Sequence, residues 1–152
     1  MGQDLFMVRP RLFFSPQQAA MNEEALSKAG ITHVLSLIGK PTRMIPEIRY
    51  GWMKIDDIPE QPIIGTSITA EKWIRNALEQ PDTKVLVYCR MGRSRSASIV
   101  MAYLILEEGL SYEQALAAVR KNNPEAQPNP GFVRQLKNIV IIAKRTRELC
   151  KS

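Results

Sequence analysis

Cysteine and histidine are scarce in this sequence, which contains two cysteines and one histidine. Cys89 ends an apolar run and Cys150 lies close to the last residue, so the pair does not suggest the disulfide framework of a small secreted domain. A reducing compartment is the simpler expectation. The single histidine, His33, falls within a run typical of a strand, and we expect it to be a packed residue rather than a catalytic one.

Long hydrophobic runs are also absent. No stretch approaches the roughly 20 apolar residues that a membrane-spanning helix needs. The first residues show neither a long apolar core nor the small-residue cleavage site of a signal peptide. We therefore expect no membrane span and an intracellular, cytoplasmic location, with the nucleus open as an alternative.

The composition is that of a globular protein, with 45% hydrophobic and 24% charged residues, which excludes disordered and fibrous classes. The length of 152 residues suits one domain over residues 1–152, which we expect to be a monomer. The net charge of +6 favours anionic ligands, although charge alone does not distinguish a phosphopeptide, a lipid head group and RNA. The position of the charges matters more.

The pattern of apolar residues and breakers predicts alternating strands and helices. Strands are expected at 31–38 and 85–88, with a short apolar stretch at 52–55 between them. Helices are expected at about 15–30, 69–79, 96–108, 111–121 and 131–149, from caps, prolines and terminal glycines. Loops are expected at 39–46 and 56–65. This alternation predicts an α/β domain with a central, mostly parallel sheet flanked by helices.

The segment between the second strand and the next helix carries the chemistry. Cys89 stands at the end of the strand and Arg95 at the start of the helix, with five residues between them. Such a turn aims backbone N–H groups at one point, and the helix dipole adds positive charge there, so the turn can bind a phosphate group. Gly92 allows the backbone to adopt positive φ or to approach the ligand closely. The residues expected to line the phosphate are Arg90, Met91, Gly92, Arg93, Ser94 and Arg95.

The same field stabilises a thiolate at Cys89, which can attack phosphorus and form a phosphocysteine that water then hydrolyses. Arg95 would hold two phosphoryl oxygens with its guanidinium fork. Ser96 could hydrogen-bond the sulfur and help it leave in the second step. This chemistry needs neither a metal nor another cofactor. The alternative is that Cys89 is a small buried apolar residue without a chemical role.

Cys89, Arg95 and Ser96 after an apolar strand resemble the signature loop of the cysteine-dependent phosphatases, specifically the dual-specificity protein phosphatases. The segment from Ala19 to Leu35 resembles the first helix and strand of that family, and Pro128 to Leu136 resembles its closing helix. The resemblance implies a dual-specificity phosphatase-like fold and hydrolysis of phosphotyrosine, phosphoserine or phosphothreonine. The expected partner is then a phosphorylated protein.

The leaving oxygen of a phosphate ester needs a proton, which calls for a carboxylic acid near the phosphate. The family carries this acid on a loop after a short strand that begins with an aromatic residue. Counted from Tyr50, the resemblance assigns the acid to Asp57, with Asp56 as the alternative. Both could instead be solvated loop charges, or Asp56 could cap local backbone N–H groups.

The sequence departs from the family at the position before the nucleophile, where Tyr88 replaces the usual histidine. In the family, that histidine helps to hold the loop and to keep the pKa of the thiol low. Its replacement by tyrosine is therefore expected to affect the rate and the pH profile of hydrolysis. It also suggests a weakly active phosphate-binding pseudophosphatase as an alternative function.

Arg90 and Arg93 are a second departure, because a basic loop resembles phosphoinositide and phospholipid phosphatases. This makes a phosphoinositide the alternative substrate. The two arginines could equally point to solvent or pair with the acidic residues Asp56, Asp57 and Glu60. An RNA 5′-triphosphatase is a weaker choice, and no nucleic-acid partner is expected, because no basic groove with interleaved aromatic residues is visible.

Overall fold

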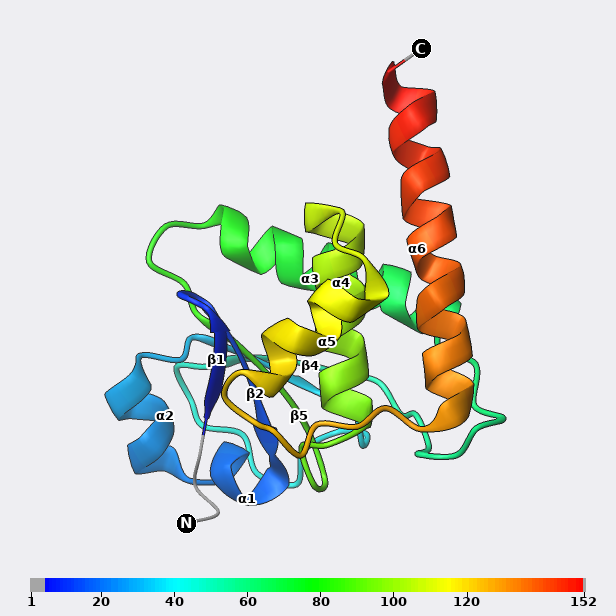
Figure 1. The fold of residues 1–152 in the computed structure, drawn as a ribbon. Coiled ribbons are helices and arrows are strands. Elements are labelled where there is room, and N and C mark those ends of the chain that lie inside the picture. Colours follow the sequence, from blue (N-terminus) through cyan, green and yellow to red (C-terminus); the bar gives the residue numbers. More distant parts are fainter. Residues whose placement is uncertain (1–4, 152) are drawn as a thin grey trace.

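The computed structural model describes residues 5–151, so residues 1–4 and 152 of the expected domain lie outside the described residues. A five-stranded sheet forms its centre, in the order β1-β2-β5-β3-β4. Its strands are β1 (Phe6–Arg9), β2 (Leu12–Pro16), β3 (His33–Ser36), β4 (Arg49–Trp52) and β5 (Val85–Cys89). The strands β2, β5, β3 and β4 run parallel, and β1 pairs antiparallel with β2. The expected mostly parallel sheet is confirmed (Figure 1).

The parallel strands end at one edge of the sheet. Pro16 at the end of β2 pairs with Cys89, and Ser36 at the end of β3 pairs with both Tyr88 and Trp52. In open α/β sheets, ligands bind outside the carboxyl ends of the strands. The register therefore places Cys89 at the edge where a ligand site is expected.

Each face of the sheet is covered by helices, because successive side chains of a strand point to opposite faces. One face carries α1 (Gln17–Ala20) and α2 (Glu23–Ala29). Its buried cluster consists of Phe13, Ala20, Leu26, Ile31, Val34, Leu86 and Tyr88. The opposite face carries α3 (Ile64–Glu79) and α4 (Arg95–Glu108), and Cys89 belongs to the cluster on this side.

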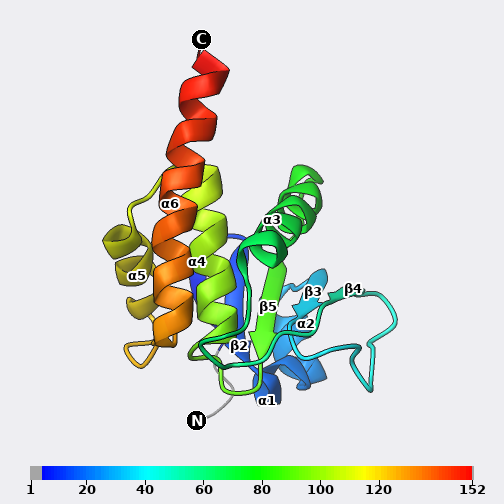
Figure 2. The ribbon, with the colours of Figure 1, turned by 90° about the vertical axis from the view of Figure 1, so that its right-hand side faces the viewer.

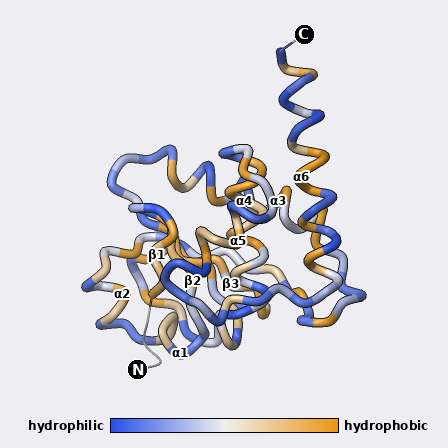
Figure 3. The backbone as a smooth tube through the Cα atoms, in the orientation of Figure 1, coloured by the Kyte–Doolittle hydropathy of each residue, from blue (hydrophilic) through white to orange (hydrophobic). Residues whose placement is uncertain are grey.

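The helix α4 lies at the centre of the helical layer. Every residue from Ser96 to Ile105 is buried, and the helix packs against α3, α5 (Tyr112–Arg120) and α6 (Pro130–Lys151). Figure 2 shows α6 alongside α4, with its last turns extending beyond the body of the molecule. Hydrophobic and hydrophilic positions alternate along α6 (Figure 3), and the buried ones end at Ala143. Within residues 5–151, no helix combines the length and the apolar character needed to cross a bilayer.

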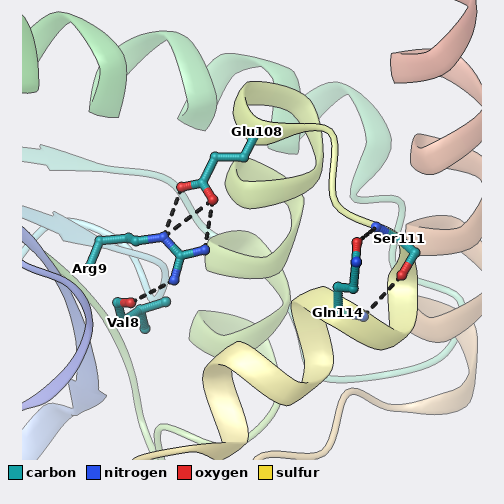
Figure 4. Close-up of polar contacts among 5 residues, drawn as sticks. All are labelled: Val8, Arg9, Glu108, Ser111 and Gln114. Atoms are coloured by element: carbon teal, nitrogen blue, oxygen red, sulfur yellow. Dashed lines mark hydrogen bonds and ion pairs between the residues drawn. The ribbon is translucent and has the colours of Figure 1, made fainter.

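Figure 4 shows two sets of polar contacts near the end of α4, one between β1 and α4 and one at the start of α5. The guanidinium of Arg9 in β1 bonds both carboxylate oxygens of Glu108, at 2.7 to 3.3 Å. The helix α5 begins with the expected capping box: the Ser111 hydroxyl accepts from the Gln114 N–H, and the Gln114 side chain accepts from the Ser111 N–H. The sequence signal for this helix start is confirmed.

The N-terminal region differs from the sequence prediction. The strands β1 and β2 were not predicted. Ser15 and Pro16 end β2, and the first helix begins directly after them at Gln17, with Pro16 rather than Ser15 as its N-cap. The expected helix over 15–30 is two helices, because the chain turns at Met21 and Asn22 caps the second one through its bond from the Ala25 N–H. Ser15 is fully buried beside β5, and that pairing outweighs its helix-capping preference.

The other elements follow the prediction more closely, although β4 occupies 49–52 and overlaps the expected apolar stretch 52–55 only at Trp52. Gly30 and Gly109 end α2 and α4 in the left-handed conformation, with φ of 76° and 73°. The helix α3 begins at Ile64, five residues before the predicted start near Thr69. It therefore includes Gly65, which was expected to end a loop. His33 is buried in β3 with its ring edge-on to Trp73, which confirms it as a packed residue. Burial, followed by the charge of Arg49, lowers the pKa of His33.

Candidate active site

The turn that joins β5 to α4, residues 89–95, is called the phosphate loop below. It packs against the end of β2 and the start of α1, where the N–H of Gln17 donates to the carbonyl of Arg90. Gly92 has a φ of +70°, and a Cβ there would lie 2.6 Å from the backbone nitrogen of Pro16. Only glycine fits this close approach without displacement of the backbone. The positive φ expected at Gly92 is confirmed, and the close approach is to the end of β2.

The sulfur of Cys89 is surrounded by hydrogen-bonding groups. The backbone N–H groups of Gly92 and Ser96 each donate to Sγ at 3.3 Å. The Ser96 hydroxyl oxygen lies 3.2 Å from Sγ, so a thiol can donate to it and a thiolate can accept from it. The sulfur also lies at the N-terminus of the 14-residue helix α4, where the dipole favours negative charge. The arrangement suits a thiolate.

Arg95 is the first residue of α4, and its side chain reaches back across the site. Its Nη1 donates to the carbonyl of Ile55 at 3.1 Å. Ile55 immediately precedes the acidic segment 56–62, called the acid loop below. The bond therefore fixes the guanidinium between the phosphate loop and the acid loop, with other N–H donors left for a ligand.

The rim of the phosphate loop carries two further arginines. Arg90 and Met91 are exposed, and Met91 is 59% exposed. Arg93 forms an ion pair with Glu125 at 2.7 Å. Its partner is thus a residue before α6 rather than one of the acidic residues Asp56, Asp57 and Glu60 named from the sequence. The pairing partly neutralises one of the two rim arginines.

The acid loop brings Asp57 close to the phosphate loop. Asp57 Oδ1 accepts a bond of 3.0 Å from the side-chain amide of Asn129, whose backbone N–H donates to the Ser94 hydroxyl at 3.1 Å. Asp56 is exposed, and its backbone N–H donates to the side chain of Gln61 at 2.9 Å. The Asp56 carboxylate is therefore not the group tied to the phosphate loop.

Three polar residues before α6 hold the phosphate loop and were not predicted. Asn123 donates to the carbonyl of Gly92 at 2.9 Å, and the Gln127 N–H donates to the carbonyl of Arg93 at 2.7 Å. Asn129 completes the set through Ser94. In the sequence, only the polar run 121–129 could have drawn attention to them, since buried polar groups need partners.

Tyr88 lies on the sheet face opposite Cys89. It is 1% exposed and packs in the apolar cluster with Phe13 and Leu86. Burial raises the pKa of Tyr88, and a side-chain hydrogen bond with Ser36 opposes that rise. The Tyr88 hydroxyl therefore stays neutral, and it offers no positive charge to the phosphate loop.

Both cysteines are free thiols, with Cys89 buried and Cys150 exposed. Over the described part of the chain, histidine, cysteine, aspartate and glutamate side chains form no group of three that could hold a metal ion.

The comparisons with known proteins agree with the site described above. Residues 12–140 match the family model described as "Dual specificity phosphatase, catalytic domain". The human protein "Dual specificity protein phosphatase 26" is 39% identical over 135 residues, which cover 85% of this chain and 64% of that protein. The chain therefore spans less than two thirds of that relative.

Two solved structures share the fold over nearly their whole length. The crystal structure of DUSP15 has a TM-score of 0.89 at 28% identity and covers 99% of this chain and 96% of that one. The structure of a tyrosine-to-histidine variant of human DUSP28 has a TM-score of 0.87 at 30% identity, with 93% and 97% covered.

Proposed function

The chain belongs to the dual specificity phosphatase catalytic domain family, and on that premise we propose that it hydrolyses phosphotyrosine, phosphoserine and phosphothreonine in proteins. The observation that carries the proposal is the set of contacts around Cys89. Two backbone N–H groups and a hydroxyl converge on the sulfur at the N-terminus of α4, beside Arg95. A buried cysteine with only a packing role would not need them.

In the first step, the Cys89 thiolate attacks phosphorus, forming a sulfur–phosphorus bond as the bond to the leaving oxygen breaks. The amides of the phosphate loop and the Arg95 guanidinium stabilise the charge on the equatorial oxygens. Asp57 gives its proton to the leaving oxygen.

In the second step, water attacks the phosphocysteine. The Asp57 carboxylate takes a proton from the water, the sulfur–phosphorus bond breaks, and inorganic phosphate leaves. The Ser96 hydroxyl, 3.2 Å from Sγ, donates to the departing thiolate. The enzyme returns to its starting state with a thiolate and a protonated acid.

Asp57 is favoured over Asp56 as the acid because its carboxylate is the one connected to the phosphate loop, through Asn129 and Ser94. Exchange of each aspartate for asparagine distinguishes them: the variant that lacks the acid loses the alkaline limb of the kcat profile.

A phosphorylated protein is favoured over a phosphoinositide because Glu125 pairs with Arg93, which leaves Arg90 as the unneutralised rim arginine. Multiply charged head groups are best held by several unpaired cations. A weakly active phosphate-binding pseudophosphatase is the second candidate, since Tyr88 provides no positive charge behind the loop.

Steady-state hydrolysis of para-nitrophenyl phosphate in the presence of EDTA tests the function. We expect turnover by the wild type, loss of turnover with retained phosphate binding in Cys89→Ser, and unchanged turnover in Cys150→Ser. Cys150 is a matched control because it is the other free thiol and is exposed on α6. Phosphate binding without turnover from pH 5 to 8 would support the pseudophosphatase instead.

A further inference from the structure

The segment 123–129 contacts three consecutive residues of the phosphate loop. Asn123 bonds the carbonyl of Gly92, the Gln127 N–H bonds the carbonyl of Arg93, and the Asn129 N–H bonds the Ser94 hydroxyl. These bonds fix the backbone of Asn129 beside the phosphate loop. In Figure 2 the start of α6, the turn after β5 and the segment that precedes α3 meet at the same end of the molecule.

The side chain of Asn129 has two partners that fix its orientation. Its Oδ1 accepts from the Phe132 N–H at 2.9 Å and so caps the first turn of α6. Because the cap requires an acceptor, the oxygen must face the helix and the amide NH₂ must face the other way. That NH₂ donates to Asp57 Oδ1 at 3.0 Å.

Other contacts press the acid loop against the same turn of α6. A Cβ on Gly131 would lie 1.9 Å from the carbonyl oxygen of Pro59, so the helix and the loop are in direct backbone contact. Gln135 bonds the carbonyl of Gln61 at 2.9 Å and accepts from the Ile63 N–H at 2.6 Å. The backbone of the acid loop is thus held at several points, while the Asp57 carboxylate is held through Asn129.

We infer that Asn129 is a positioning residue that orients Asp57 for proton transfer and links the acid loop to the phosphate loop. Since Asp57 Oδ1 accepts from the amide, the proton of the neutral acid is carried by Oδ2. Asn129 thereby determines which oxygen donates and restricts rotation of the carboxyl group. The role of Asn129 rests on the proposed function of Asp57 as the acid.

The exchange Asn129→Ser separates this role from the role in the helix cap. Serine caps helices about as well as asparagine, so it can keep the bond from Phe132. It has no NH₂ group to donate to Asp57 across the same distance. We therefore expect a melting temperature close to that of the wild type, together with a defect in proton donation.

The leaving group of the substrate reveals such a defect. Phenyl phosphate has a poor leaving group that needs a proton, whereas 2,4-dinitrophenyl phosphate has a good leaving group that does not. We expect kcat/KM of Asn129→Ser to fall about tenfold on phenyl phosphate, as for the loss of one good hydrogen bond, and to change less than about twofold on the dinitrophenyl ester. Asp57→Asn should show the same selectivity with a larger loss.

The double variant Asn129→Ser/Asp57→Asn should be no slower on phenyl phosphate than Asp57→Asn, because Asn129 acts through Asp57. Equal losses on both esters, or an unchanged dependence on the leaving group, would overturn the role of Asn129 while the phosphatase function stood. A wild type that hydrolyses neither ester would overturn the proposed function, and the role of Asn129 with it.

Discussion

Ser96 contacts Cys89 twice, since its N–H lies 3.3 Å from Sγ and its hydroxyl oxygen lies 3.2 Å from the same atom. The hydroxyl matters most when the sulfur leaves phosphorus. We expect Ser96→Ala to release the first product in a burst and then to turn over about 10- to 100-fold more slowly than the wild type, because hydrolysis of the phosphocysteine becomes limiting. Rapid-mixing kinetics with para-nitrophenyl phosphate measure both phases.

Ser98 provides the control for this exchange. It is fully buried in the same helix, and its hydroxyl has no hydrogen-bond partner among the described residues. Ser98→Ala should keep the kinetics of the wild type. A Ser96→Ala variant without a burst, or with the same burst as Ser98→Ala, would show that the second step does not need the hydroxyl.

Tyr88→His tests the departure from the family. Tyr88 is buried in the apolar cluster on the sheet face opposite Cys89. A histidine with a donor toward the loop should raise kcat on para-nitrophenyl phosphate, by about tenfold for one charge-assisted bond. It should also lower the free energy of unfolding by about 1 to 3 kcal/mol, because a polar ring replaces tyrosine in an apolar cluster.

Tyr88→Phe is the matching control, since it removes the hydroxyl and keeps the ring. It should leave kcat within about twofold of the wild type and change the free energy of unfolding by no more than about 1 kcal/mol. A large loss of kcat in Tyr88→Phe would mean that the tyrosine hydroxyl itself supports catalysis.

Glu125 is expected to influence substrate choice. The side chains of Glu125 and Arg93 are 66% and 53% exposed. Loss of their ion pair should therefore hardly affect stability. Glu125→Gln releases Arg93 and should raise kcat/KM for a soluble phosphoinositide about threefold relative to a phosphopeptide, an advantage that salt should diminish.

Glu113→Gln changes the net charge by the same amount at the start of α5 and should not alter that ratio. If both glutamine variants shift the ratio equally, the effect is one of total charge, and the specific role of the Arg93 pair is wrong.

Stability should depend on pH through Glu71 in α3, which is 7% exposed. Burial, then a side-chain hydrogen bond with Glu107, raises the pKa of Glu71 to about 7 from its ordinary value of 4.5, against the opposing charge of Arg75. Between these values the unfolded chain loses the proton and the folded chain keeps it, so stability falls as pH rises from about 4.5 to 7.

Glu71→Gln should remove the loss of stability that Glu71 causes as pH rises. Glu79→Gln, at the exposed end of the same helix, should leave that loss unchanged. Urea unfolding at pH 5 and pH 8 measures the difference. A Glu71→Gln variant that loses as much stability between the two pH values as the wild type would contradict the assignment.

The parts of the site that are close in sequence could be predicted. The strand that ends at Cys89, the turn with Gly92 and the helix that begins at Arg95 lie within one short segment, whose residue types determine the turn and the dipole. Gly30 and Gly109 likewise gave correct helix ends, because a left-handed terminal residue is a local property.

The contacts that join distant segments could not be predicted. Asn129 and Asp57 are 72 residues apart, and only the packing of α6 against the acid loop brings them together. The ion pair of Arg93 with Glu125 also depends on the tertiary fold. For the same reason the first helix was predicted two residues too early: pairing with β5 makes Ser15 and Pro16 the end of β2, and α1 begins at Gln17.

The most direct test of the mechanism is to trap the phosphocysteine. The wild type and Ser96→Ala, mixed with an aryl phosphate and quenched in acid, should yield a peptide containing Cys89 with one added phosphoryl group, more abundant in Ser96→Ala and absent from Cys89→Ser. Turnover without any such peptide, or phosphoryl transfer to a residue other than Cys89, would contradict the account.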